Sequence, residues 1–330
     1  MDNINFSIII PHYNVPKLLA RCLYTIPQRD DLEVIVVDDN SSPDIVDFDN
    51  FPGKNRPNTR IILDKKGGGG GYARNKGLEV ARGKWVLFSD SDDYFTYCLN
   101  DMLDKYVNSE ADVVYFNAIG SNAEYYTPSP RANHLNNAIM LSMTNREKGE
   151  AYLRFLFGEP WCKLAKREMI EKYKIRFDET PIHNDTAYSY LVGYYARTVD
   201  IERHAIYVIT FREGSVSVSL SDEKRLIRIE VFARAEKFRK DHGVDIEKYG
   251  YTEGLAEWHY YEVYSMYRAG EKSLAMKGIE IIHKYNPSLK NIKWRIWKRV
   301  PRQIFNKVKH NVGNLFRAIH LMSPKPNYDQ

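Results

Sequence analysis

Two carboxylates separated by one residue stand at Asp90-Ser91-Asp92, directly after the apolar run Trp85–Phe88. Mg²⁺ and Mn²⁺ prefer one or two carboxylates together with phosphate oxygens and water. Asp90 and Asp92 are therefore candidate metal ligands, at a site where the metal would bridge a diphosphate and neutralise its charge as it departs. The alternative is a turn-forming acidic cluster that caps the next helix.

A second acidic pair, Asp38-Asp39, also follows an apolar run, Leu32–Val37. A carboxylate in this position can accept a hydrogen bond from a base N–H or a ribose hydroxyl. The alternative is an Asx-turn or a helix N-cap. A further polar cluster, Pro11–Asn14, follows the apolar run at the start of the chain.

Five consecutive glycines, Gly67–Gly71, precede a helical pattern that carries Arg74 and Asn75 near its start. Helix N-termini attract anions, so Arg74 and Asn75 are candidates for binding phosphate. The segment is not a Walker A loop, because Gly83-Lys84 is followed by Trp85 and not by Ser or Thr. The glycines themselves are also compatible with a simple flexible loop.

The elements that must position these clusters alternate between strands and helices over the first part of the chain. Helical patterns cover Val15–Pro27 and Gly71–Ala81. This alternation predicts a parallel sheet, in which ligands bind beyond the carboxyl ends of the strands, where the polar clusters stand. The predicted strands are Phe6–Ile10, Leu32–Val37, Arg60–Leu63, Trp85–Phe88 and Asp112–Phe116.

The pattern loosens after about residue 117. Residues 118–145 are rich in Asn, Ser and Pro, which predicts an irregular loop or lid region. From residue 221 onward the chain is predicted to be helical. The further predicted elements are helices at Arg146–Phe157, Lys166–Tyr173, Ala187–Ala196 and near 221–241, 249–269 and 272–285, and a strand at Ala205–Phe211.

Four ordered motifs resemble the family 2 glycosyltransferases of the GT-A fold over roughly residues 5–115. Fainter similarity continues with a Trp-x-Lys-Leu element at Trp161–Leu164, with Arg176–Glu179 followed by His183-Asn184-Asp185, and with Phe211–Ser217. Asn184 stands where the family usually has Glu. The four motifs are Ser7–Asn14, Leu32–Ser42, Ala73–Leu78 and Ala81–Asp93.

The resemblance implies a role for each matching residue. Asp39 would hold the base of the nucleotide, usually uracil, in a pocket walled by Pro11 and Tyr13. Asp90 would lie at the ribose and metal edge with Ser91, Asp92 would bind Mn²⁺ or Mg²⁺ directly, and Asp93 would be a nearby alternate. Asp185 would be the general base of a direct displacement that inverts the anomeric carbon.

The chemistry agrees with that assignment, because a sugar hydroxyl is a poor nucleophile at neutral pH. A carboxylate opposite the leaving diphosphate can accept its proton as attack develops. The alternative for Asp185 is an N-cap of the helix that starts near Thr186. His12, His183 and His204 are candidates for additional metal ligands, or else ordinary packing and surface residues.

Charge is distributed unevenly along the chain. The net charge is +5, but Ile281–Tyr328 contains eleven Lys or Arg and no Asp or Glu, so the remainder carries −6. A helical stripe of apolar residues within 290–321 has basic flanks, which predicts docking on an anionic membrane surface. The alternative is a stripe that packs on the catalytic body. A nucleic-acid partner is not expected, since the acidic clusters would repel phosphate in the absence of a metal.

The sequence thus predicts an α/β protein of the GT-A type, with a mostly parallel sheet covered by helices on both faces and a helical C-terminal region. The expected divisions are a nucleotide-sugar-binding half at 1–117, an acceptor-binding half at 118–220, a helical extension at 221–286 and a basic tail at 287–330. Scattered cysteines and the lack of a secretion signal or an apolar span favour a cytoplasmic protein, peripheral on the inner face of the plasma membrane.

The expected activity is transfer of a sugar, from a donor that the resemblance to the family implies is UDP-linked, to a hydroxyl of a lipid-linked glycan in capsular or other surface polysaccharide synthesis. A polymerising synthase is disfavoured, because such enzymes usually carry transmembrane helices and a Gln-x-x-Arg-Trp-like motif. A nucleic-acid-binding protein that uses the basic tail, and a non-catalytic binding module of the same fold, are the alternatives from other classes.

Overall fold

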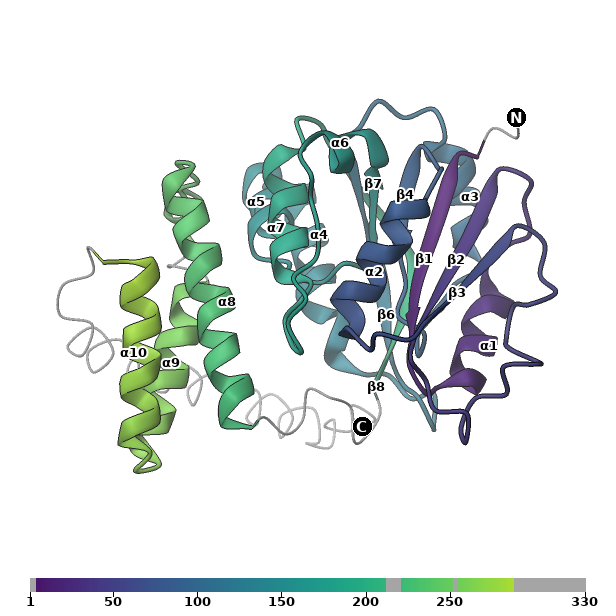
Figure 1. The fold of residues 1–330 in the computed structure, drawn as a ribbon. Helices are drawn as coiled ribbons and strands as arrows, with labels where there is room; N and C mark the ends of the chain where they lie inside the picture. The colour runs from purple at the N-terminus through teal and green to yellow at the C-terminus, as the bar shows by residue number, and fades with distance from the viewer. Residues whose placement is uncertain (1–3, 212–220, 252–254, 288–330) are drawn as a thin grey trace, which may run out of the picture.

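The computed structural model describes residues 4–211, 221–251 and 255–287 of the 330-residue chain. Their framework is one eight-stranded sheet in the order β3-β2-β1-β4-β7-β6-β8-β5 (Figure 1). The strands are β1 (Phe6–His12), β2 (Leu32–Asp39), β3 (Thr59–Asp64), β4 (Trp85–Phe88), β5 (Tyr94–Phe95), β6 (Val113–Asn122), β7 (Lys163–Lys166) and β8 (Val199–Phe211).

The sheet is mixed and mostly parallel. Strands β1–β4 are mutually parallel where they pair, and β6 pairs in parallel with β8. The short strand β7 runs antiparallel between β4 and β6, and β5 runs antiparallel to β8. The fold predicted from the sequence, a GT-A-type sheet followed by a helical C-terminal region, is confirmed.

Helices lie on both faces of this sheet. In Figure 1, α2 lies in front of the sheet, where it packs on β1 and β2, and α3 lies behind it. The helices that accompany the sheet are α1 (Pro16–Thr25), α2 (Gly69–Val80), α3 (Cys98–Tyr106), η1 (Pro130–Ala132), α4 (Asn133–Thr144), α5 (Arg146–Phe155), α6 (Arg167–Lys172) and α7 (Thr186–Tyr195).

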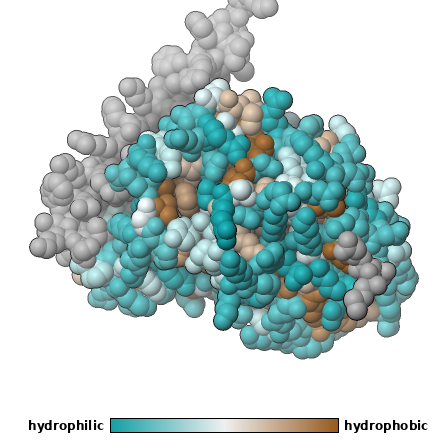
Figure 2. All heavy atoms as spheres, turned by 90° about the horizontal axis from the view of Figure 1, so that it is seen from above, coloured by the Kyte–Doolittle hydropathy of each residue, from teal (hydrophilic) through white to brown (hydrophobic). Residues whose placement is uncertain are grey.

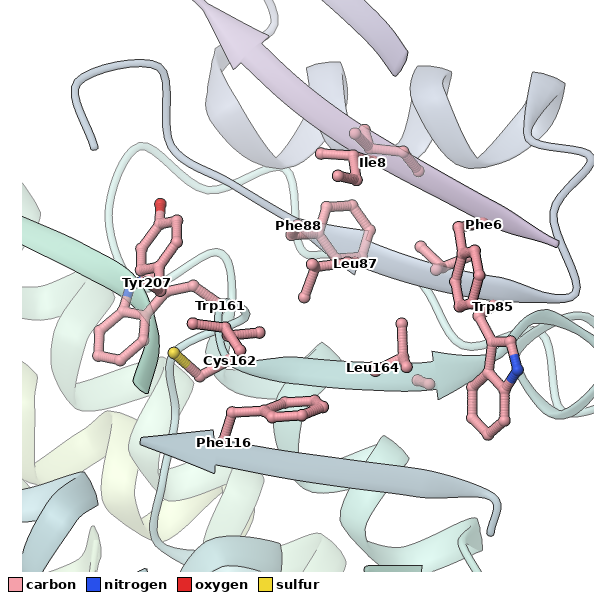
Figure 3. Close-up of a cluster of buried hydrophobic side chains, with 14 of the residues drawn as sticks. Phe6, Ile8, Trp85, Leu87, Phe88, Phe116, Trp161, Cys162, Leu164 and Tyr207 are labelled. Atoms are coloured by element: carbon pink, nitrogen blue, oxygen red, sulfur yellow. The ribbon is translucent and has the colours of Figure 1, made fainter. Parts of the chain in front are cut away.

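The core lies between the sheet and these helices. Every residue of β2 and of β4 is buried, as expected for central strands covered on both faces. Figure 3 shows how aromatic and aliphatic side chains from β1, β4, β6, β7 and β8 meet in this core. The indole ring of Trp161 stacks on Tyr207 with ring centroids 6.1 Å apart, which joins the segment before β7 to β8.

The C-terminal helices form a smaller unit with its own apolar core. They are α8 (Asp222–Asp241), η2 (Glu247–Tyr249), α9 (Leu255–Arg268) and α10 (Lys272–Tyr285), which confirms the predicted helical region. Ile229, Tyr260, Met266 and Ile282 are buried at their centre. Helix α8 contacts α7, so this unit lies beside the α7 end of the sheet domain (Figure 1).

The prediction of an irregular loop or lid region at 118–145 is wrong. Strand β6 continues to Asn122, and α4 occupies most of the remainder. Its Asn and Ser residues are compatible with a helix here because Leu135, Ala138 and Ile139 pack one face of α4 into the core. Helix α3 and strands β5 and β7 were not predicted either, because they are short or carry polar residues.

Strand β6 passes through residues 117 and 118, where the sequence predicted the division between the donor and acceptor halves. Both halves therefore contribute to one continuous sheet. Residues 212–217 of the predicted Phe211–Ser217 loop, and the predicted membrane-docking stripe at 290–321, lie outside the described residues. Within the described parts of the chain, no helix is both long and apolar enough to cross a membrane.

Candidate active site

A cavity of about 830 Å³ lies where the sheet meets α7 and α8. Its volume is within the range of small-molecule sites, about 300–1,000 Å³. Figure 2 shows one face of the molecule, which is mostly hydrophilic with small, separate apolar patches. The polar residues that line the cavity include Arg74, Asp90, Asp92, Asp93, Arg131, His134, Glu159, His183, Asn184, Asp185, Thr210 and Arg228.

The acidic loop after β4 is held in place by α1 and β8. The carbonyl oxygen of Asp92 accepts a hydrogen bond from Nη2 of Arg21 at 2.5 Å and another from Oγ1 of Thr210 at 2.7 Å. The backbone N–H of Asp90 donates to the hydroxyl of Tyr207 at 2.8 Å. Backbone contacts therefore fix the loop, and the side chains of Asp90 and Asp92 remain on the cavity wall.

Asp93 differs from its neighbours because its carboxylate is turned toward β8. Oδ1 accepts a hydrogen bond from the backbone N–H of Thr210 at 2.7 Å. Burial, together with the nearby charges of Asp90 and Asp92, raises the pKa of Asp93 well above its usual range. Asp93 thus has a structural position at the base of the loop, and this geometry disfavours the predicted role as an alternate metal ligand.

Arg74 connects the acidic loop to the segment before α7. Its Nη2 donates to Oδ1 of Asp90 at 2.5 Å, and its Nη1 donates to Oδ1 of Asn184 at 3.0 Å. The guanidinium carbon lies 5.4 Å from the ring centroid of Phe177. Residue 74 is 8% exposed, so this cation is largely desolvated and its position is well defined.

Gly71 allows α2 to approach the segment that carries Asn184. A Cβ atom at residue 71 would lie 1.9 Å from the carbonyl oxygen of Asp178 and 2.9 Å from Cβ of Asn184. No side chain larger than hydrogen fits without a backbone shift. The glycine run is thus more than a flexible loop, because one of its members sets the distance between Arg74 and its partners.

Asp185 lies at the N-cap position of α7, but its carboxylate makes no hydrogen bond to the N–H groups of that helix, which the structure describes throughout. The side chain is on the cavity wall. Burial raises the pKa of Asp185 to about 6; Arg74 opposes this rise, and Glu159 and Asp90 add to it. This geometry does not support a capping role, and the pKa suits a group that accepts a proton near neutral pH.

Glu159 and His134 form a second polar pair on the cavity wall. Oε1 of Glu159 lies 3.2 Å from Nε2 of His134. Burial alone would raise the pKa of Glu159, but His134, the charge of Lys163 and a backbone hydrogen bond together outweigh burial, and the pKa is lowered. The pKa of His134 is raised, chiefly by Glu159, so each group favours the charged form of the other.

The backbone of Glu159 is fixed by a fully buried lysine. Nζ of Lys163, on β7, donates to the carbonyl oxygens of Phe157 at 2.9 Å and Glu159 at 2.5 Å. Oγ of Ser189, on α7, donates to the same Glu159 carbonyl at 3.0 Å. Burial lowers the pKa of Lys163 to about 7, with the charges of Glu159 and Asp185 acting in the opposite direction.

The two residues of the second acidic pair, Asp38 and Asp39, accept hydrogen bonds from different parts of the structure. Asp38 accepts from His12 at 2.8 Å and from the backbone N–H and hydroxyl of Ser41, which is the local turn role considered as its alternative. Asp39 accepts instead from the backbone N–H groups of Gly68 at 2.8 Å and Gly69 at 2.6 Å. The carboxylate predicted to bind a base thus holds the glycine run in this structure.

The structure brings some of the predicted site residues together and leaves others apart. Arg74, Asp90, Asp92 and Asp185 line the same cavity. Pro11, Tyr13, Asp39 and Ser91 are outside its lining. Pro11 pairs with Val37 near the ends of β1 and β2. The residues predicted to form the base pocket therefore lie at this edge of the sheet but apart from the cavity.

The described residues include no group of three or more His, Cys, Asp or Glu side chains arranged to hold a metal ion. His12 is engaged at both ring nitrogens, by Asp38 and by the backbone N–H of Val15, and His204 pairs with Glu202. Two carboxylates, those of Asp90 and Asp92, fit a cation whose remaining ligands are phosphate oxygens and water.

Sequence reasoning missed several residues of the cavity. His134, Glu159 and Arg228 come from separate segments and meet only through the tertiary fold. Two further residues lie outside the lining but fix its loops: Lys163, which binds the carbonyl of Glu159, and Arg21, which binds that of Asp92. Lys163 carried a usable signal, because a lysine inside the apolar stretch Cys162–Ala165 is unusual for a buried strand.

This arrangement, a mixed sheet with acidic clusters at the carboxyl ends of its strands, is of the GT-A type. Residues 7–174 match the family described as Glycosyl transferase family 2, which is half of the chain. The chain belongs to glycosyl transferase family 2.

Among curated proteins, the chain is 28% identical to putative glycosyltransferase EpsH of Bacillus subtilis over 222 residues, which cover 63% of this chain and 61% of EpsH. It is 37% identical to poly(ribitol-phosphate) beta-N-acetylglucosaminyltransferase TarS of Staphylococcus aureus over 95 residues, 27% of this chain and 16% of TarS. The match thus spans less than two thirds of either relative.

Solved structures give the same fold. Residues 1–349 of S. aureus TarS in complex with UDP-GlcNAc have a TM-score of 0.54 at 23% identity, covering 71% of this chain and 66% of that one. The mannosyltransferase PcManGT from Pyrobaculum calidifontis, in complex with GDP-Man and Mn²⁺, has a TM-score of 0.54 at 15% identity, covering 87% and 76%.

Proposed function

We propose that this enzyme transfers a sugar from a nucleotide-diphosphate donor, a UDP-sugar, to a hydroxyl of a glycan acceptor, with inversion at the anomeric carbon. The observation that carries this proposal is the shared cavity of Asp90, Asp92 and Asp185. Two carboxylates suited to a diphosphate-bound cation thus lie in the same cavity as a carboxylate suited to accept a proton. Such a division of tasks is what direct displacement requires.

Donor binding is assigned to the edge of the sheet formed by β1 and β2. Asp39 would accept a hydrogen bond from the N–H of the base. Pro11 and Tyr13 would flank the ring of the base, for which the side chain of Tyr13 is accessible, being 59% exposed. Asp39 accepts one hydrogen bond on each carboxylate oxygen, from Gly68 and Gly69, and its remaining lone pairs can accept the single N–H of uracil. UDP-GlcNAc in the TarS complex supports a uridine donor.

Asp90 and Asp92 are proposed to hold Mg²⁺ or Mn²⁺ together with the donor phosphates, with Ser91 between them. A cation bound there neutralises charge on the departing diphosphate. Mn²⁺ in the PcManGT complex supports a metal-assisted reaction. Arg74 keeps Asp90 oriented through its hydrogen bond and adds a fixed positive charge on the same wall.

Asp185 is proposed as the general base. The acceptor oxygen attacks the anomeric carbon from the face opposite the diphosphate, and the bond from that carbon to the diphosphate oxygen breaks. The hydroxyl proton passes to the carboxylate of Asp185 as the new glycosidic bond forms. With a pKa of about 6, Asp185 is ionised at neutral pH and still basic enough to assist.

A panel of nucleotide sugars tests the proposal. The full chain is incubated with each UDP-, GDP- and dTDP-sugar and Mn²⁺ or Mg²⁺, and release of the nucleotide and the thermal shift are measured. Binding and turnover of a UDP-sugar are expected. Absence of binding by every nucleotide in the panel would leave a non-catalytic module, and a salt-dependent gel shift with DNA or RNA would favour the nucleic-acid alternative.

The cellular setting belongs to the same proposal. Eleven basic residues and no acidic ones between Ile281 and Tyr328 favour attraction to an anionic membrane, where a lipid-diphosphate-linked acceptor for capsular or other surface polysaccharide would lie. The enzyme would then be cytoplasmic and peripheral on the inner face of the membrane. Sedimentation with anionic liposomes, compared between the full chain and a truncation after Asn286, tests this; equal supernatant fractions at low salt would exclude it.

A further inference from the structure

The pair Glu159–His134 has no task in the transfer mechanism, although it lies on the wall of the reaction cavity. Both side chains are partly exposed, Glu159 by 35% and His134 by 37%. They reach the cavity from different elements, His134 from α4 and Glu159 from the segment between α5 and β7. A charged pair that faces a cavity and stays accessible can bind a ligand.

This pair is held rigidly. Lys163 and Ser189 both donate to the carbonyl oxygen of Glu159, which ties the segment before β7 to α7, the helix that follows Asp185. On the other side, the imidazole of His134 packs 5.8 Å from the ring of Phe157 and 6.5 Å from that of Trp161. Fixed polar groups beside an aromatic wall are typical of sites that orient a small ligand.

We infer that Glu159 and His134 form the acceptor subsite, and that they bind the hydroxyl groups of a neutral sugar ring beside Phe157 and Trp161. This inference rests on the proposed function, because it names the ligand class for the acceptor side of the same cavity. Glu159 accepts hydrogen bonds from sugar hydroxyls, and the neighbouring aromatic side chains provide an apolar wall for the ring.

The charges near the pair argue for a neutral ring and against a phosphorylated one. Ionised Glu159 accepts hydrogen bonds but repels phosphate oxygens. The cations of the cavity are already engaged: His134 pairs with Glu159 itself and Arg74 with Asp90, Arg131 donates to the carbonyl of Thr210 at 3.2 Å, and Arg228 pairs with Glu262 at 3.2 Å. A phosphate near Glu159 would have to draw one of these cations away from its partner.

Saturation-transfer NMR on the full chain with UDP and Mg²⁺ tests the inference. The probes are methyl glycosides of common hexoses and N-acetylhexosamines, each paired with its 6-phosphate. We expect at least one neutral glycoside to bind the wild type better than its phosphate. Glu159→Gln should weaken that binding about tenfold, because it removes a charge-assisted hydrogen bond and keeps the shape.

Glu171→Gln is the matched control, because Glu171, on α6, pairs with Arg176 at 2.8 Å and lies outside the cavity lining. It should bind glycosides like the wild type. Equal glycoside binding by the wild type and Glu159→Gln, preference for the phosphates, or no binding of any glycoside would each overturn the inference. UDP affinity is measured on the same samples by calorimetry. If the wild type does not bind UDP, the proposed function is contradicted instead.

Discussion

Arg74 and Asp90 lie at the centre of the site, joined by a hydrogen bond of 2.5 Å between Nη2 and Oδ1. The other amino group of the same guanidinium donates to Asn184, the residue before Asp185. One buried cation thereby connects a proposed metal ligand with the segment that carries the proposed base. Both connections depend on the planar, two-armed shape of arginine.

The first prediction separates the shape of Arg74 from its charge. Arg74→Lys keeps the charge but cannot make both hydrogen bonds, and should lower kcat/KM about tenfold to a hundredfold, since hydrogen bonds to charged groups contribute about 1.5–3 kcal/mol. Arg74→Met also removes the charge that opposes the raised pKa of Asp185. Its acid limb in a kcat–pH profile should therefore move to higher pH. An unmoved limb in Arg74→Met would contradict this coupling.

Removal of Asp92 should abolish the metal dependence of donor binding. Asp92→Ala is expected to lower transfer by several orders of magnitude, because a proposed ligand of the diphosphate-bound cation is lost. Calorimetry of UDP with and without Mn²⁺ measures the effect, and Asp101→Ala, at an exposed position on α3, is the control. Full wild-type activity in excess chelator would show that the reaction needs no divalent ion.

Loss of the Asp39 carboxylate should weaken UDP binding more than it slows transfer. A contact to the base is remote from the reacting bond, so Asp39→Ala is expected to raise the Kd for UDP about tenfold with a smaller change in kcat. Exposed Asp44 provides the control substitution. If Asp39→Ala binds UDP, GDP and free phosphate with unchanged relative affinities, Asp39 does not recognise uracil.

The activity should decline in acid because of Asp185. The pKa of its carboxyl is raised to about 6, so the proton-accepting form is lost as pH falls through that value. We expect kcat to drop about tenfold for each pH unit below the pKa. Asp185→Asn should retain UDP binding and lose transfer at every pH. Near-normal turnover by this variant would remove Asp185 from the mechanism.

Lys163 should make stability depend on pH in an unusual direction. Its pKa is about 7 in the folded protein and about 10.5 in the unfolded chain, so the unfolded state binds more protons between these values. The contribution of Lys163 to the free energy of unfolding should therefore rise with pH over this window. The difference in Tm between the wild type and Lys163→Met is expected to grow from pH 7 to pH 9, with exposed Lys277→Met showing no such trend.

The central strands could be predicted from the sequence because their apolar runs are continuous. Leu32–Val37 and Trp85–Phe88 correspond closely to β2 and β4, which are buried along their whole length. By contrast, β7 has four residues and begins with the buried Lys163, so neither its length nor its composition indicated a strand. Helix α4 was missed because it follows a stretch rich in Asn, Ser and Pro and only one of its faces packs inward.

The site divides in the same way. Arg74, Asp90, Asp92 and Asp185 stand in motifs with a recognisable order, so their candidacy followed from the sequence. Glu159 could not be found by that route, because its environment is made by Lys163, Ser189 and His134, which the fold brings together from three elements. The assigned roles of Arg74, Asp90, Asp92, Asp185 and Glu159 stay predictions that the experiments above address, and the division of the chain at residue 117 stays a prediction.

Strand β6 runs from Val113 to Asn122 and pairs with β8 on both sides of a shift in register between Phe116 and Ala118. The part of the chain that carries Asp90 and Asp92 and the part that carries Asp185 are nevertheless built on one hydrogen-bonded sheet. A continuous sheet resists hinge bending. The distance between the proposed leaving group and the proposed attacking hydroxyl is therefore set when the protein folds. Adjustment to acceptors of different size then falls to the surrounding loops and to α8.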